Sequence, residues 1–104
     1  MRKRIQILAV TLFTFGFISA QSVNFVNGTW EEVKAKAKSE KKFLFVDCYT
    51  EWCGFCKLLD KNTFSNEKVG EIMNAKFVSV KIDMEKDYGI NLGMKYRVNA
   101  FPTA

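Results

Sequence analysis

Histidine is absent from the 104-residue chain, and cysteine occurs only three times. A structural zinc site usually takes four cysteine or histidine ligands, so one copy of this chain cannot assemble such a site. Proline occurs once and glycine six times, and no repeat or low-complexity tract is present. With so few turn-forming residues, no linker divides the chain, whose length suits one small domain. We therefore expect one domain and no metal centre.

Negative charge is missing from the first 20 residues, which hold three basic side chains and no acidic one. The whole chain has 16 basic and 11 acidic residues and a net charge of +5, so 13 basic and 11 acidic residues remain after position 20. The remaining lysines are interleaved with glutamates rather than gathered into a patch. Nucleic-acid binding requires a focused basic surface, and that class of partner is therefore not expected.

The N-terminal 20 residues have the layout of a signal peptide. Basic residues at positions 2–4 precede an uncharged stretch over residues 5–18, and the small residues Ser19 and Ala20 follow. An uncharged stretch of about 14 residues matches the apolar core of a signal peptide, whereas a membrane-spanning helix needs roughly 20 apolar residues. An uncleaved membrane anchor is the alternative. We expect cleavage after Ala20, a mature domain over residues 21–104, and an extracytoplasmic, periplasmic location.

Two apolar segments have the pattern of buried strands. Residues 43–46 are apolar throughout, which is typical of a strand covered on both faces. Phe77–Asp83 alternates, with Val78, Val80 and Ile82 on one side. The long segment between them has room for a helical crossover, and such a crossover predicts parallel pairing. The expected fold class is therefore α/β.

Helical periodicity marks four further segments. Thr29 and Glu32 have the spacing of a capping box, and Ser65 is placed to cap a later helix. Leu58 and Leu59 are expected to face inward from the second of these helices, and the third has apolar residues at Val69, Ile72 and Met73. The predicted helices cover residues 30–39, 53–61, 65–73 and 88–96.

Cys53 and Cys56 are separated by two residues and lie where a buried strand gives way to a helix. Free amide groups and the helix dipole favour an anion at such a position, and can lower a thiol pKa to roughly 3.5–7.5. Cys53, at the exposed end, is expected to attack a substrate disulfide, and Cys56, one turn further in, to resolve the mixed disulfide. The alternatives are half of a zinc site and a passive disulfide, which would close too small a loop to add much stability.

Several segments resemble the thioredoxin superfamily in identity and order. They are Asp47, the stretch Glu-Trp-Cys-Gly-Phe-Cys-Lys at 51–57, the strand at 78–83, and Phe-Pro-Thr at 101–103. Residues 42–64 are more similar to the exported thioredoxin-like domains of thiol–disulfide interchange proteins than to cytosolic thioredoxin. The resemblance covers residues 30–104. It implies a thioredoxin-like fold, in which a central mixed sheet is flanked by helices.

The resemblance assigns roles to matching positions. Asp47 matches a buried acid beneath the resolving cysteine, whose raised pKa would let it take the proton from Cys56; an Asp that merely caps the turn is the alternative. Trp52 matches a tryptophan that shields the cysteines. Pro102 matches a proline with a cis peptide bond that faces them. The Phe101 backbone would then pair with an extended segment of the substrate.

Four other positions bear on the expected site. Lys81 resembles a lysine near the buried acid, although a solvated strand lysine fits the sequence equally well. Gly54 and Phe55 lie between the two cysteines and are expected to support the site or contact substrate. Phe55 stands where cytosolic thioredoxins have proline, so their redox potential cannot be transferred. Cys48 is an additional thiol, which we expect to be buried and inert and to point away from Asp47.

Members of the superfamily continue past the cis proline with two antiparallel strands and a final helix. The sequence reaches Ala104, two residues beyond Pro102. We therefore expect a C-terminal hairpin and last helix to be missing from this chain, and residues 21–104 to fold poorly without them.

Taken with the resemblance, the cysteine pair favours an exported thiol–disulfide oxidoreductase that uses no cofactor and reduces or exchanges protein disulfides through a Cys53–Cys56 couple. The expected partners are disulfide-containing exported proteins and an upstream thiol electron donor, which a membrane protein could supply. An oxidising role is the nearest rival, and the reduction potential separates the two. The alternative from another class is a peptide-binding or chaperone-like module of the same fold, with secondary redox activity.

Overall fold

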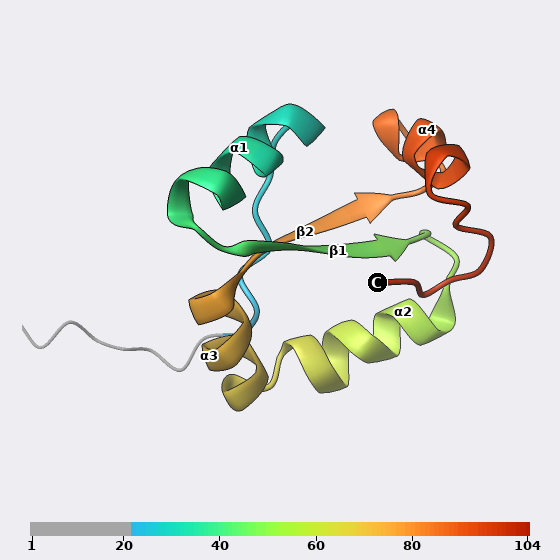
Figure 1. Cartoon of the computed structure of the whole chain (residues 1–104). Helices are drawn as coiled ribbons and strands as arrows, with labels where there is room; N and C mark the ends of the chain where they lie inside the picture. Colours follow the sequence, from blue (N-terminus) through green and yellow to red (C-terminus); the bar gives the residue numbers. More distant parts are fainter. Residues whose placement is uncertain (1–21) are drawn as a thin grey trace, which may run out of the picture.

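Two parallel strands form the centre of the computed structural model, which describes residues 22–104. The predicted signal peptide lies outside these residues. Figure 1 shows one pair of helices on each face of the strands. The strands are β1 (Phe43–Tyr49) and β2 (Phe77–Asp83); α1 (Trp30–Glu40) and α4 (Tyr88–Lys95) lie on one face, and α2 (Gly54–Leu59) and α3 (Glu67–Lys76) on the other. The predicted α/β class and parallel pairing are confirmed. Within the described range, no helix is long and apolar enough to cross a membrane.

Helix α1 begins where the sequence predicted. The Thr29 hydroxyl oxygen accepts a hydrogen bond from the Glu32 N–H at 3.2 Å and donates one to the Glu32 carboxylate, also at 3.2 Å. The helix ends at Lys41, whose left-handed conformation (φ 55°) lets the N–H of Lys42 donate to the carbonyl oxygen of Ala37 at 2.9 Å. Val33 is buried on the inner side of α1. The capping box therefore directs the apolar stripe of this helix onto the sheet.

The strand register decides which polar groups meet on each face. Asp47 of β1 lies directly opposite Lys81 of β2. Because side chains alternate along a strand, both project from one face, and the next residues project from the other. The opposite face carries the main core, which contains Val33, Cys48, Val80, Ile82, Met84 and Leu92. The apolar and polar faces of the sheet thus follow from the register.

Strand β1 differs in two respects from the prediction. It continues beyond residue 46 to Tyr49, and Phe43, its first residue, is 77% exposed. The buried positions are Asp47 and Cys48, near its other end. The expectation of a strand covered on both faces is therefore wrong at its beginning. Hydrophobicity of a short run shows that a strand is present, but not which end of it the helices cover.

The segment predicted as one helix over residues 53–61 divides into α2 and a π-helical turn, η1 (Asp60–Phe64). Leu58 is exposed, so the prediction that it faces the core is wrong, whereas Leu59 beside it is half-buried. The π-helical turn shifts the phase of the residues that follow it, and the sequence period does not reveal this shift. Phe64 supplies the buried contact here, and its ring packs against Phe25 and Phe45.

Asn66, rather than the predicted Ser65, caps α3. The Asn66 side-chain oxygen accepts hydrogen bonds from the N–H groups of Lys68 and Val69 at 3.0 and 3.2 Å. The Ser65 hydroxyl instead donates to the carbonyl oxygen of Lys61 in the preceding turn. Asparagine and serine are about equally good N-caps, so adjacent candidates could not be separated by residue type alone.

Short segments extend the sheet at both edges. Phe25 forms a parallel bridge to Ser79 of β2, and Thr103 forms an antiparallel bridge to Cys48 of β1. The Cys48 N–H donates to the Thr103 carbonyl at 2.8 Å, and the Thr103 N–H donates back at 3.2 Å. The sheet is therefore mixed, as predicted. The antiparallel bridge also holds residues 101–103 beside β1, where Figure 1 shows the end of the chain.

Gly89 allows α4 to approach the end of β2 closely. A Cβ atom at Gly89 would collide with the backbone carbonyl of Asp83. The Gly89 N–H also donates to the Lys86 carbonyl at 3.0 Å, which closes the turn between β2 and α4. Gly93, one turn later, is less restricted, because the nearest atom to its Cβ position is the terminal methyl of Met84 at 3.2 Å. The two glycines therefore have different structural roles.

We expect Gly89→Ala to lower the free energy of unfolding by roughly 1–3 kcal/mol, because the added methyl group meets backbone atoms that cannot move separately. Gly93→Ala is the matched control. Alanine is better than glycine in a helix by about 1 kcal/mol, and the Met84 side chain can yield, so this variant should be neutral or slightly stabilising. Urea unfolding of both variants measures the difference. Similar effects of the two substitutions would contradict the close-approach interpretation.

Candidate active site

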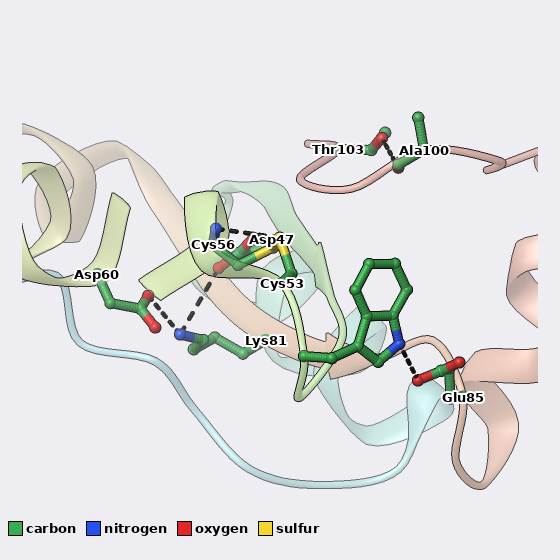
Figure 2. The surroundings of a disulfide bond; sticks show 9 residues. Asp47, Cys53, Cys56, Asp60, Lys81, Glu85, Ala100 and Thr103 are labelled. Carbon is green, nitrogen blue, oxygen red and sulfur yellow. Dashed lines mark hydrogen bonds and ion pairs between the residues drawn. A yellow bond between two sulfur atoms is a disulfide. The ribbon is translucent and has the colours of Figure 1, made fainter. Parts of the chain in front are cut away.

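Cys53 and Cys56 form a disulfide bond at the beginning of α2, with their Cα atoms 5.2 Å apart. Cys53 is the N-cap residue, and its sulfur accepts a hydrogen bond from the Cys56 N–H at 3.1 Å. Figure 2 shows this contact beside the sulfur–sulfur bond. The Cys53 sulfur thus lies where the helix offers unpaired amide groups, which is the environment that favours a thiolate in the reduced form.

Both cysteines are buried in the disulfide form, Cys53 at 3% exposure and Cys56 at 4%. The expectation that Cys53 is the exposed member of the pair is wrong for this oxidised form. Two contacts explain its burial. The Cys53 N–H donates to the carbonyl oxygen of the buried Thr50 at 3.2 Å, and the disulfide ties its sulfur to Cys56. The order of residues along a helix does not reveal that the Cys53 side chain turns inward.

Asp47 is buried on β1, at 2% exposure, and Figure 2 shows it among the side chains that surround the disulfide. Burial raises the pKa of the Asp47 carboxyl, because the charged form loses its solvation. The Lys81 ammonium group opposes this rise from 3.8 Å, whereas the Asp60 carboxylate adds to it. The net direction is upward, so Asp47 holds its proton more readily than an ordinary aspartate.

Lys81 lies between two carboxylates. Its Nζ atom forms an ion pair with Oδ1 of Asp60 and a longer one with Oδ2 of Asp47. The rings of Phe25 and Tyr49 lie 5.3 and 5.1 Å from the same Nζ atom. Lys81 is therefore the lysine near the buried acid that the resemblance implied, and not a freely solvated strand residue. Its shorter contact, however, is to Asp60.

Asp60 was not identified from the sequence, although a signal was present. It lies four residues after Cys56, and its N–H donates to the Cys56 carbonyl oxygen, so the helix continues between them. Residues at this spacing share one face of a helix. An acid one turn beyond the second cysteine was thus a candidate for the polar face of the site.

Trp52 is exposed and is held by two neighbours. Its indole Nε1–H donates to the Glu85 carboxylate at 2.7 Å, and its ring meets that of Phe101 edge to face at 6.0 Å between centroids. The Glu85 N–H in turn donates to the Asp83 side chain at 2.9 Å. Sequence reasoning missed Glu85, because nothing in the pattern relates a turn residue to a tryptophan 33 positions earlier. Trp52 therefore joins the turn after β2 to the Phe101 segment.

The Phe101–Pro102 peptide bond is cis, as the resemblance implied. Pro102 lines an open, mainly apolar groove beside α2. The groove has a volume of about 480 Å³ and is lined by Phe55, Leu58, Leu59, Asn62, Thr63 and Pro102. Phe55 is exposed, and nothing lies within 4 Å of a Cβ position at Gly54. The structure thus presents an accessible apolar surface next to the cysteine pair.

Cys48 lies on the other face of the sheet from Asp47, within the main core. With Leu44 and Val46 it lines a separate cavity of about 400 Å³. Burial raises the pKa of the Cys48 thiol, and the nearby Asp47 charge raises it further. Such a thiol is a poor nucleophile at neutral pH. In the part of the chain that the structure describes, no three cysteine, histidine or acidic residues are grouped to hold a metal ion.

Two solved structures have a fold similar to that of this chain. A putative disulphide-isomerase from Bacteroides thetaiotaomicron is 43% identical, with a TM-score of 0.71 over 79% of this chain and 68% of its own. A thioredoxin from Thermus thermophilus is 23% identical, with a TM-score of 0.69 over 79% of this chain and 62% of its own. The second comparison supports the fold alone.

Curated relatives are much longer proteins. Spermatogenesis-associated protein 20 of Rattus norvegicus is 36% identical over 56 residues, or 54% of this chain and 7% of the rat protein. The thiol:disulfide interchange protein DsbD of Campylobacter jejuni is 28% identical over 82 residues, or 79% of this chain and 14% of that protein. This chain thus spans only a small part of the length of the relatives it matches.

The protein family described as "Thioredox_DsbH: Protein of unknown function, DUF255" matches residues 17–99, most of the chain. That range includes Cys53, Cys56, Asp47 and Lys81. The fold, the cysteine pair at the start of α2 and the match to this family agree. The chain therefore belongs to the thioredoxin-like DsbH family, whose relatives include thiol–disulfide oxidoreductases.

Proposed function

We propose that this protein is an extracytoplasmic thiol–disulfide oxidoreductase that reduces or exchanges disulfides in exported proteins through Cys53 and Cys56. The observation that carries the proposal is the disulfide between these residues at the N-terminus of α2. The similar proteins named as a disulphide-isomerase and as a thiol:disulfide interchange protein support this chemistry. The predicted signal peptide over residues 1–20 supports export.

The proposed reductive cycle begins with the dithiol form. The Cys53 thiolate attacks one sulfur of the substrate disulfide; a mixed disulfide forms, the substrate bond breaks, and the other substrate sulfur leaves as a thiolate. The Cys56 thiolate then attacks the Cys53 sulfur, so that the Cys53–Cys56 bond forms and the second substrate sulfur is released. Two electrons have passed to the substrate. An upstream thiol donor returns two electrons to the pair by the reverse exchange.

Asp47 is the proposed proton acceptor for Cys56. A thiol must lose its proton before it resolves a mixed disulfide, and a base works best when its pKa is close to the ambient pH. The buried position raises the pKa of Asp47 in that direction. Trp52 and Phe101, which contact each other beside Pro102, are the proposed binding surface for an extended substrate segment.

The rival function is peptide binding with secondary redox activity. The exposed side chains of Phe55 and Leu58, which line the same groove, favour it, because apolar groups gathered on a surface often mark a binding site. In the proposed enzyme the same surface holds the substrate during exchange. The direction of electron flow depends on the reduction potential of the Cys53–Cys56 couple relative to its donor.

We expect Cys53→Ser to lower the turnover of a protein-disulfide reduction assay by at least about a hundredfold, because the attacking sulfur is lost. Cys48→Ala is the matched control, since Cys48 lies on the other face of the sheet, and it should keep turnover within about threefold. A peptide-binding module would retain its binding to unfolded proteins in Cys53→Ser and show little turnover before the substitution. That combination of results would reject the oxidoreductase proposal.

We expect Cys53 to be the most reactive thiol of the reduced protein. Its N-cap position favours the thiolate, whereas burial raises the pKa of Cys48. Brief alkylation with iodoacetamide at mildly acidic pH, followed by peptide mapping, measures the labelling of each cysteine. Preferential labelling of Cys56 or Cys48 would show that the attacking residue has been wrongly assigned.

We expect Asp47→Asn to slow resolution of the mixed disulfide by roughly tenfold or more, and attack by less than about threefold, because the acid serves Cys56. In the wild type the resolution rate should rise with pH through an inflection above the usual range of an aspartate, since the base must be deprotonated and burial raises its pKa. The variant should lack this inflection. Asp87→Asn, at an exposed acid, is the control.

Stopped-flow measurements with a substrate that forms a stable mixed disulfide separate the two steps. Equal slowing of both steps, or a resolution profile that keeps its inflection in Asp47→Asn, would remove Asp47 from the proposed mechanism.

A further inference from the structure

The lysine beside the buried acid is shared unequally between two carboxylates. Lys81 Nζ is 3.8 Å from Oδ2 of Asp47, a distance at the limit of an ion pair, and it lies closer to Oδ1 of Asp60. Figure 2 shows both contacts radiating from the same ammonium group. The register of β1 and β2 would by itself place Lys81 against Asp47. Asp60 is therefore the group that draws the ammonium toward the helix.

Asp60 occupies this place because of the helix that also carries the cysteines. Its backbone N–H bonds to the Cys56 carbonyl oxygen, one helical turn earlier, so both residues lie on the face that covers the sheet. Asp60 is also where α2 changes into η1. The resolving cysteine and the second carboxylate are thus fixed to one rigid element, while Asp47 and Lys81 are fixed to the strands.

We propose that Asp60 is a positioning residue, which holds Lys81 away from Asp47 and so keeps the Asp47 carboxyl able to exchange a proton with Cys56. The proposal rests on the proposed function, because it concerns the control of the same site. If Lys81 instead paired tightly with Asp47, the carboxylate would be stabilised and would no longer be a useful base near neutral pH.

Asp60 acts on Asp47 in two ways, and both disfavour the charged form of the Asp47 carboxyl. Its negative charge disfavours a second charge nearby, and its ion pair withholds the compensating positive charge. Within residues 22–104, the charged groups that act on Asp47 are Lys81 from β2 and Asp60 from the α2–η1 junction. The cysteines of α2 are uncharged in the disulfide form. The opposite face of the sheet, toward α1 and α4, is apolar near Asp47.

The Lys81–Asp60 ion pair is a weak candidate for a purely stabilising role. The Lys81 and Asp60 side chains are 25% and 42% exposed, and ion pairs of that exposure typically contribute little to the stability of a fold. The effect of the Lys81–Asp60 ion pair on the Asp47 carboxyl is less screened by water, because Asp47 is almost fully removed from water. The titration of Asp47 is therefore the property that should respond to Asp60, more than the stability of the fold.

A double-mutant cycle on the oxidised protein tests the proposal without depending on turnover. The titration midpoint of the Asp47 carboxyl is followed by carbon-13 NMR in the wild type, Asp60→Asn, Lys81→Met and the double variant. Asp60→Asn should lower the midpoint by about one pH unit or more, because Lys81 is released to Asp47. Lys81→Met should raise it. Glu71→Gln, which removes an exposed acid from α3, is the charge control and should leave it unchanged.

The double variant decides whether Asp60 acts through Lys81. With methionine at position 81, the shift caused by Asp60→Asn should shrink to half or less of its value in the wild-type background. A shift of undiminished size would mean that Asp60 acts only through its own charge and would overturn the positioning role. An unchanged or raised midpoint in Asp60→Asn would overturn it as well.

A kinetic measurement separates this inference from the proposed function. The pH inflection of mixed-disulfide resolution should move in Asp60→Asn in the same direction as the Asp47 midpoint. If the midpoint moves and the rate profile does not, proton exchange between Asp47 and Cys56 is disproved and the proposal with it. Thiol–disulfide exchange itself would be unaffected by that result, because the Cys53→Ser comparison tests it independently.

Discussion

Burial of the Asp47 carboxyl is the physical constraint on which the rest of the site depends. A carboxylate that is removed from water must be protonated or compensated by a nearby positive charge, because its desolvation costs several kcal/mol. The parallel register of β1 and β2 brings a lysine to the opposite position, yet that lysine makes its shorter contact with Asp60. The compensation is incomplete, so the pKa of Asp47 remains raised. A carboxyl with a raised pKa can both hold and release a proton. The proposed role of Asp47 beside the Cys56 thiol requires this property.

Three segments far apart in the chain meet around the disulfide because separate contacts place each of them. The β1 strand runs directly into the turn that buries Cys53, and the Cys48–Thr103 bridge ties the cis Pro102 segment to the same strand. The turn after β2 reaches Trp52 through the Glu85 carboxylate. The close approach of Gly89 to Asp83 closes that turn. The position of Trp52 therefore depends on helix packing at the end of β2, as well as on its place next to Cys53.

Much of the fold and the central residues of the site were predictable, for identifiable reasons. Alternation in Phe77–Asp83 and the apolar run before Asp47 indicated two parallel strands, and the spacing of Cys53 and Cys56 predicted a pair at a helix start. The cis bond came only from the resemblance, since residue patterns do not distinguish it. Leu58 was wrongly placed in the core, because an apolar residue in so short a helix does not show which side of the helix covers the sheet. Glu85 was missed because its partner Trp52 is distant in the chain, whereas the helical spacing of Asp60 from Cys56 was a usable signal that was overlooked.

The cysteine pair is buried, whereas the side chains around it are exposed. The proposed chemistry uses both features. The sulfur of Cys53 is almost inaccessible in the disulfide form, while the neighbouring Trp52 and Phe55 side chains are open to water. Attack on a substrate requires the Cys53 sulfur to approach another sulfur atom in line, so opening the disulfide must also free that sulfur from Cys56. A substrate segment that covers Trp52 and Phe55 removes apolar surface from water, and that gain favours the approach. In the proposed reaction, the exposed aromatic side chains supply affinity, whereas selectivity for a disulfide depends on the buried Cys53, the helix terminus and Asp47.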